Sequence, residues 1–159
     1  MRPILLIARG ASAALVICLV ALPVRAQSAN ADSATIVATV HRYIAAMSAR
    51  DTAYLRRASL PTMATVGIST ATGEVTVRTL DEFLAGTASS PRVFSGEIWS
   101  PEVSIDGPIA RLVAPYVTRF DGVLSHCGTD HYVLVWSGGQ WRASQMVFTR
   151  RTEGCAAPR

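Results

Sequence analysis

The stretch IARLVAPYVTRF, residues 109–120, is followed by Asp121-Gly122 and then by VLSHCGTDHYVLVW, residues 123–136. Both runs are rich in β-branched and aromatic residues, which favour strands. An Asp-Gly pair between two such runs is a strong hairpin signal, because both turn positions take positive φ angles that few other residues adopt. The sequence therefore predicts a long antiparallel hairpin over residues 109–136.

Shorter runs of the same alternating texture flank this hairpin and predict further strands. These runs are Met63–Ser69, Val75–Arg78, Val93–Trp99, Glu102–Ile105 and Gln140–Thr149. Turn residues separate several of them, as in Asp106-Gly107-Pro108 and Ser137-Gly138-Gly139. The second half of the chain is thus predicted to be a meander of antiparallel strands.

Helical periodicity dominates the segment before the strands. Apolar residues recur there at three- and four-residue steps: Ile36, Val37, Val40, Tyr43, Ile44 and Met47. We expect Asp32 or Ser33 to cap a first helix that runs to Arg50. A second helix begins at residues 51–52 and closes before Pro61, because the residue before a proline avoids helical angles.

A third, short helix is predicted between the early strands, where Thr79 or Asp81 caps it and Gly86 ends it. Helices followed by antiparallel strands make an α+β domain. The sequence shows no repeat and no linker that would divide the domain.

Residues 1–26 have the features of a bacterial secretory signal peptide. After a positively charged start, residues 11–22 are apolar but shorter than the about 20 residues that span a bilayer. Val24-Arg25-Ala26 forms an A-x-A-like cleavage site. We therefore predict a single domain over residues 27–159, exported to the periplasm or the extracellular space. An uncleaved membrane anchor is the alternative.

All fifteen cationic residues are arginines, and the net charge is +4. Three of these arginines lie in the predicted signal peptide, which leaves twelve against eleven acidic residues. Such a balance argues against a nucleic-acid partner, which needs a clustered positive surface. No stretch after Gln27 is long and apolar enough to span a membrane. The absence of lysine excludes Schiff-base chemistry.

Two cysteines, Cys127 and Cys155, remain after the predicted cleavage. In an oxidising compartment an even pair predicts one disulfide, which would pin the C-terminal tail to the strand carrying Cys127. The alternative is a pair of free thiols, with Cys127 made reactive by the neighbouring His126.

The motifs of several common chemistries, including serine hydrolysis, are missing from the sequence. It contains no C-x-x-C, no G-x-S-x-G and no glycine-rich phosphate loop after a strand. His126, Cys127 and His131 fall on both faces of one strand, which makes a poor zinc site. We therefore expect no cofactor and no metal ion.

Short motifs along the second half match one known group of proteins in their order and spacing. They are Ile98–Val103, Asp106–Ala110, Ala114-Pro115-Tyr116, Ser125–Asp130, Gly139–Arg142 and Thr149–Arg151 with Gly154-Cys155. Together with the helices, they resemble the nuclear transport factor 2-like superfamily over most of residues 34–155. Its members include ketosteroid isomerases, SnoaL-like cyclases and many uncharacterised secreted proteins. The resemblance implies a curved antiparallel sheet wrapped around N-terminal helices, forming a cone with an internal pocket.

Strand alternation then selects the residues that would line such a pocket. In the strand around Cys127, we assign the face carrying Tyr132 and Leu134 to the interior. The polar pocket candidates on this face, on the matching face of the preceding strand and on the helices are Tyr43, Tyr54, Tyr116, His126, Asp130 and Tyr132.

The sequence leaves the function open between three hypotheses. The leading one is a small-molecule-binding protein that holds an apolar or aromatic ligand in the cone without strong catalysis. The second is an isomerase- or cyclase-like enzyme in which Asp130 or His126 transfers a proton, since a carboxyl in an apolar pocket has a raised pKa. The third is a homodimer without ligand, packed through Val113 and Val117 on the outer face of the sheet. A purely structural His126–Asp130 pair is the alternative to a polar role in the pocket.

Overall fold

The computed structural model describes the backbone of residues 24–155 and the side chains of residues 32–155. Its helices are α1 (Val24–Ala49), α2 (Thr52–Arg57) and α3 (Leu80–Ser89). Its strands are β1 (Ser59–Ser69), β2 (Val75–Thr79), β3 (Phe94–Ile98), β4 (Glu102–Asp106), β5 (Ile109–Phe120), β6 (Val123–Ser137) and β7 (Gln140–Arg150). The predicted signal peptide lies outside the described residues, except for its last three residues, which begin α1. Within the described part, no helix has the length and apolar character needed to cross a membrane.

The first helix is longer than the periodicity predicts. It begins at Val24 rather than at a cap at residues 32–33, because neither proline nor glycine interrupts the segment between them. The helix ends where Arg50 takes a φ angle of 55°. Asp51 then caps α2 by accepting a hydrogen bond from the backbone N–H of Tyr54 at 2.8 Å.

The predicted end of the second helix is wrong. The helix stops at Arg57, and Pro61 lies inside β1 instead of closing a helix. Pro61 falls in the register break between Ser59 and Ala64, where β1 leaves its partner strand. The missing N–H of proline therefore costs no ladder hydrogen bond at this position.

The third helix begins as predicted but ends later. The backbone N–H of Glu82 donates to Thr79 Oγ1 at 3.3 Å, and the backbone N–H of Thr79 donates to the Glu82 carboxylate at 2.8 Å. The helix continues through Gly86 to Ser89, because one exposed glycine costs only about 1 kcal/mol relative to alanine.

All seven strands form one mixed sheet in the order β2-β1-β7-β6-β5-β3, with β4 also paired to β5. The predicted hairpin is the β5–β6 pair, and Asp121 and Gly122 turn it with φ angles of 55° and 79°. The described pairs are antiparallel except β1 with β7, which run parallel. No tight turn joins β1 to β7, so the local sequence pattern does not determine their relative direction.

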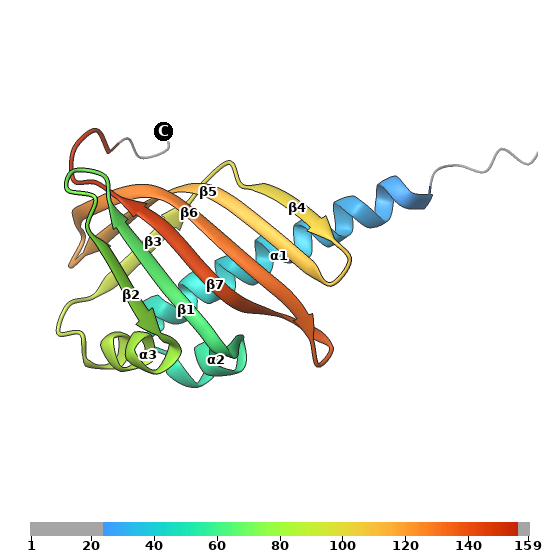
Figure 1. The fold of residues 1–159 in the computed structure, drawn as a ribbon, viewed down its shortest axis with the longest axis horizontal. Helices are drawn as coiled ribbons and strands as arrows, with labels where there is room; N and C mark the ends of the chain where they lie inside the picture. Colours follow the sequence, from blue (N-terminus) through green and yellow to red (C-terminus); the bar gives the residue numbers. More distant parts are fainter. Residues whose placement is uncertain (1–23, 156–159) are drawn as a thin grey trace, which may run out of the picture.

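The sheet is strongly curved, and the helices lie along its concave side (Figure 1). The first helix contacts β3, β4 and β5, whereas α3 contacts β1 and β2. Buried side chains of the hairpin fill the space between sheet and helices: Ala110, Leu112, Ala114, Tyr116, Tyr132 and Leu134. The α+β cone and the inner face assigned to the hairpin are therefore confirmed.

The convex face carries the disulfide. Val117 and Cys127 lie opposite each other on β5 and β6, and both are buried without belonging to the main core. Cys127 is disulfide-bonded to Cys155, and its backbone exchanges two hydrogen bonds of 2.9 Å with Arg151. The predicted bridge thus pins the C-terminal segment to β6. Val117 is already buried within one chain and is not available to a partner as expected, whereas Val113 stays partly exposed.

Removal of the disulfide is expected to destabilise the fold. The bridged residues are 28 positions apart, and closing a loop of this length in the unfolded chain corresponds to about 3–4 kcal/mol. Cys155→Ser should lower the free energy of unfolding by about that amount, as measured by urea denaturation. Reduction of the wild-type protein should give the same loss and leave the variant unchanged. A reductant effect of equal size on both proteins would contradict this account.

Candidate functional site

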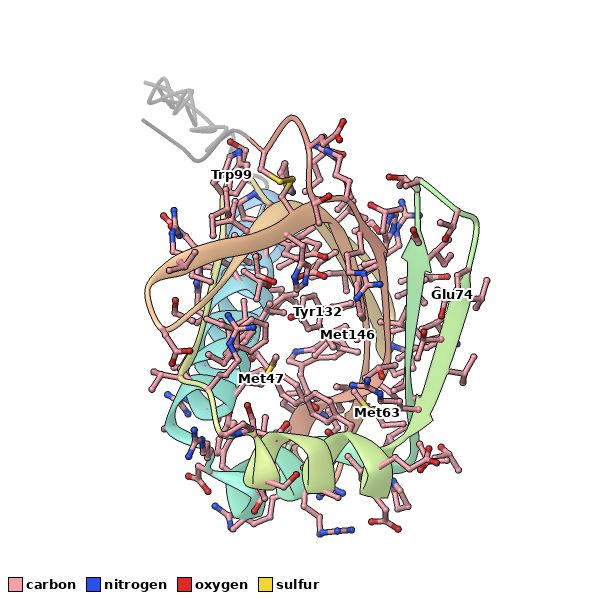
Figure 2. All side chains as sticks on the ribbon, turned by 90° about the vertical axis from the view of Figure 1, so that its left-hand side faces the viewer. Met47, Met63, Glu74, Trp99, Tyr132 and Met146 are labelled. Carbon is pink, nitrogen blue, oxygen red and sulfur yellow. A yellow bond between two sulfur atoms is a disulfide. The ribbon has the colours of Figure 1, made fainter. Side chains whose placement is uncertain are left out.

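A cavity of about 160 Å³ lies between the concave face of the sheet and the helices. Figure 2 looks into this space, with Met47, Tyr132 and Met146 labelled around it. Helices α1 and α3 and strands β1, β2, β3, β5, β6 and β7 all contribute residues to its wall. Most of these residues are apolar or aromatic, so the wall offers a ligand only a few polar groups.

Asp130 places a carboxyl group inside this cavity. It lies on β6 between Ala114 of β5 and Phe148 of β7, and only 7% of its surface is exposed. Neither a hydrogen bond nor an ion pair joins its carboxyl to any residue that the structure describes. Burial alone raises the pKa of the Asp130 carboxyl from 3.8 to about 7. Near neutral pH the group therefore changes between a neutral donor and an ionised acceptor.

Tyr116 lies opposite Gly128 and is held in place by a hydrogen bond. Its hydroxyl donates to the backbone carbonyl of Thr149 at 2.9 Å, and its ring packs edge-on against His126 and Phe148, with centroids 5.8 and 6.2 Å away. Gly128 permits this arrangement, because a Cβ at its position would overlap the Thr149 carbonyl. Burial raises the pKa of Tyr116 above its usual value. The hydroxyl proton of Tyr116 is thus used in a hydrogen bond to the backbone.

Tyr132 has a hydroxyl that no described residue engages in a hydrogen bond. The residue lies in the cavity wall opposite Leu112 and Met146, and its ring packs edge-on against Tyr43 at 6.4 Å. Burial, and then the charge of Asp130, raise the pKa of Tyr132 well above its usual value. The Tyr132 hydroxyl therefore stays protonated and can donate to a ligand.

His126 lines both the inner cavity and two clefts outside it. Its Nδ1 lies 3.1 Å from Ser125 Oγ. Burial, and then the charge of Arg150, lower the pKa of His126 and favour the neutral ring. The interpretation of His126 and Asp130 as a structural pair is wrong: they form no ion pair, because residues four apart on a strand lie about 13 Å apart along it.

Tyr43 and Tyr54 do not line the cavity. Tyr43 is buried in the core, where its hydroxyl forms a 2.9 Å hydrogen bond with Ser59 Oγ and its ring stacks on Phe83. Burial raises the pKa of Tyr43 to about 12. Tyr54 is partly buried and packs against the same core. Helical periodicity identifies an inward-facing residue but does not tell whether empty space remains beside it.

Residues that the sequence does not single out form the rim of the cavity. An outer cleft of about 670 Å³ shares part of its wall with the inner cavity: Met47, Arg78, Phe83, Phe94 and Phe120. Phe120 lies on the predicted inner face of β5, so alternation could have found it. No local signal marks Arg78, whose position depends on how β2 pairs with β1 at the edge of the sheet.

Metal ligands are not gathered in this region or elsewhere in residues 32–155. There, no group of three or more His, Cys, Asp or Glu side chains is placed to hold an ion. The chemistry that the arrangement offers is hydrogen bonding and proton exchange at Asp130, with Tyr132 as a neighbouring donor.

No family model matches the chain, and the search of curated proteins gives no significant match. Solved structures do match. An NTF2-like protein of unknown function from Silicibacter pomeroyi superposes with a TM-score of 0.58 and 23% identity, covering 77% of this chain and 98% of that one. The protein has the nuclear transport factor 2-like fold.

Two further solved structures also match this chain. A candidate dehydratase of the NTF2-like family from Streptomyces avermitilis gives a TM-score of 0.63 at 13% identity, covering 77% of this chain and 98% of that one. A protein of unknown function from Mycobacterium tuberculosis gives 0.67 at 14% identity, covering 80% and 76%. At these identities the NTF2-like resemblance establishes the fold and leaves the activity to be argued from the site.

Asp130→Asn is expected to stabilise this NTF2-like domain, and more strongly at higher pH. The folded-state pKa of about 7 lies above the ordinary value of 3.8. Ionisation of this carboxyl is therefore unfavourable in the folded state. The group costs no stability below about pH 4, and the free energy of unfolding falls as the pH rises to about 7. The full shift corresponds to about 4 kcal/mol.

Urea denaturation at about pH 5 and about pH 8 should show the gap between the variant and the wild type widening by about 2–3 kcal/mol. Asp106→Asn, at an exposed position at the end of β4, is the matched control and should leave the pH dependence of stability unchanged. Parallel pH profiles for the wild type and Asp130→Asn would rule out the raised pKa.

Proposed function

We propose that the protein is an exported binding protein for a small, mostly apolar molecule that carries one hydrogen-bonding group. The observation that carries this proposal is the Asp130 carboxyl, buried in an apolar cavity with no partner among the described residues. No fully buried side-chain nitrogen or oxygen in the described residues lacks a partner, so the carboxyl oxygens of Asp130 keep accessible surface inside the cavity. A ligand that enters the cavity can therefore form a hydrogen bond with them. Export rests on the sequence of residues 1–26.

The volume of the cavity suits a ligand portion of about one ring. An apolar cavity of about 150 Å³ holds benzene, and this one measures about 160 Å³. Phe94 and Phe148 supply flat aromatic surface, and Met146 supplies an adaptable side chain. Asp130 and Tyr132 add an acceptor and a donor, which would fix the orientation of the ligand.

Proton transfer by Asp130 is the second candidate function, and its pKa of about 7 favours this role. Two features support binding better. The Tyr116 hydroxyl already donates to the Thr149 carbonyl, which leaves Tyr132 as the single donor among the described tyrosines of the cavity wall for a developing enolate oxygen. His126 lies too far along β6 to work with Asp130 on one proton.

Phenol is expected to bind more tightly than benzene, because only phenol can hydrogen-bond to Asp130. A hydrogen bond to a charged group contributes about 1.5–3 kcal/mol, so the two dissociation constants should differ by about 10- to 100-fold. Asp130→Leu keeps a side chain of similar size and should abolish the preference for phenol. NMR titration of the oxidised protein measures both constants.

Asp106→Asn serves again as the control and should keep the preference. A preference that survives in Asp130→Leu would remove Asp130 from the binding site. Failure of both compounds to bind at any concentration would refute the binding function itself.

We also infer that two copies pair through the convex face of the sheet. Directly opposed residues form a row across five strands: Val77, Val66, Val147, His131 and Val113. Each of them keeps exposed surface, and for Val77 the exposed fraction reaches 63%. A contiguous row of mostly apolar residues on an open sheet face is typical of a surface that packs against another sheet.

Val147→Glu, in the middle of this row, is expected to convert a dimer into a monomer, because it would bury a carboxylate at the interface. Gln140→Glu adds the same charge at the start of β7, outside the row, and should leave the dimer intact. Sedimentation equilibrium over a range of concentrations measures both. A wild-type protein that stays monomeric throughout would overturn the inference.

A further inference from the structure

Three arginines surround the outer cleft that adjoins the cavity. Arg50, Arg78 and Arg92 all contribute to its wall, and Glu82 is the single acidic residue among the side chains that line it. The cleft is therefore electropositive where it meets the apolar interior. Such a combination does not follow from the net charge, because the arginines of the domain are nearly balanced by acidic residues.

Two of these arginines are fixed by contacts of their own. Arg92 Nε donates to the Asp121 carboxylate at 3.2 Å, and its guanidinium lies 4.5 Å above the centroid of the Phe120 ring. Arg50 Nη2 donates to the backbone carbonyl of Arg92 at 3.1 Å. These contacts hold positive charge at the rim without leaving either guanidinium fully available.

Arg78 is the available cation. It lines the inner cavity, the outer cleft of about 670 Å³ and a second cleft of about 280 Å³, so it stands where these spaces meet. Neither a hydrogen bond nor an ion pair joins its guanidinium to any other described residue. A guanidinium offers a planar set of donors that matches a carboxylate in a bidentate arrangement.

Two acidic residues near this rim, Glu82 and Glu97, are occupied elsewhere, and Glu74, which lines the second cleft with Arg78, forms no ion pair with it. The Glu82 carboxylate accepts hydrogen bonds from the backbone N–H and the hydroxyl of Thr79, at 2.8 and 2.9 Å. Its pKa is lowered by these hydrogen bonds and, least of all, by the charge of Arg78. Glu97 pairs with Arg119 at 3.5 Å. The positive charge of Arg78 is therefore not satisfied by a direct partner within the described chain.

We propose that the ligand is an amphipathic carboxylate, whose apolar end fills the cavity and whose carboxylate is bound by Arg78 at the rim. This inference rests on the binding function proposed above and specifies its ligand class. The apolar walls accept the ring or alkyl end, and the guanidinium accepts the charged end.

Asp130 determines which end of such a ligand points inward. A carboxylate placed beside the Asp130 carboxyl would meet a like charge in an apolar setting, which is strongly unfavourable. A hydroxyl or carbonyl group on the apolar end, in contrast, can hydrogen-bond to Asp130 or to Tyr132. The site thus has two polar groups: Asp130 is buried and acidic, and Arg78 is basic and lies at the rim. Together they impose a single orientation on the ligand.

Isothermal titration with a series of phenyl-substituted acids, from benzoate to phenylbutanoate, and with the matching primary amides tests this proposal. At least one acid is expected to bind about tenfold or more tightly than its amide. Arg78→Gln should remove this difference without changing the affinity for the amide or for phenol. Arg111→Gln, exposed on the convex face of β5, is the matched control and should keep the difference.

Salt gives a second readout, since a contact at the rim is screened by ions whereas burial of a neutral ring is not. Raising the salt concentration should weaken the binding of the acid and leave the binding of the amide unchanged. Equal affinities of acid and amide in the wild type, or an equal loss of both in Arg78→Gln, would overturn the carboxylate inference and leave small-molecule binding in place. Failure of the acids, the amides and phenol alike would refute the binding function together with this inference.

Discussion

The pairing of β5 with β6 is the constraint on which the rest of the structure depends. Its register, from Ile109 opposite Val135 to Phe120 opposite Val123, is started by a tight turn that leaves little freedom to slip. A shift by one residue would move Asp130 and Tyr132 to the convex face. The irregularity at residues 118–119 adds bending to the pair. The register of the strands, and not the conformation of loops, therefore places the polar groups of the cavity.

The strand β6 combines a costly feature and a stabilising one within a few residues. Asp130 is buried without a partner, and its raised pKa corresponds to about 4 kcal/mol when it is ionised. Cys127, three residues earlier on the other face, anchors a disulfide that contributes about 3–4 kcal/mol. The cost of ionised Asp130 and the contribution of the disulfide to the free energy of unfolding are thus similar in size and opposite in sign.

Local patterns in the sequence were sufficient for the features that local physics controls. The turn at Asp121-Gly122 and the inner face of the hairpin follow from residue preferences and strict alternation. The bridge between Cys127 and Cys155 follows from an even pair of cysteines in a chain whose sequence predicts export.

Features that depend on distant parts of the chain could not be obtained in this way. The parallel pairing of β1 with β7, and with it the place of Pro61 in an unpaired stretch, depends on tertiary contacts. The same holds for the separation of Tyr43, which is packed in the core, from Tyr132, which faces the cavity. The position of Arg78 at the rim depends on the pairing of β2, the edge strand that carries it, with β1.

The position of β1 beside β7 also governs the order in which the molecule can be completed. Thr70, directly after β1, hydrogen-bonds to the Arg150 carbonyl, 80 residues further along the chain. Contacts between such distant segments form late, because a long loop must close before they give any stabilisation. Strand β7 joins β1 to β6 in the sheet, so the wall of the cavity is complete only after β7 has paired with both strands.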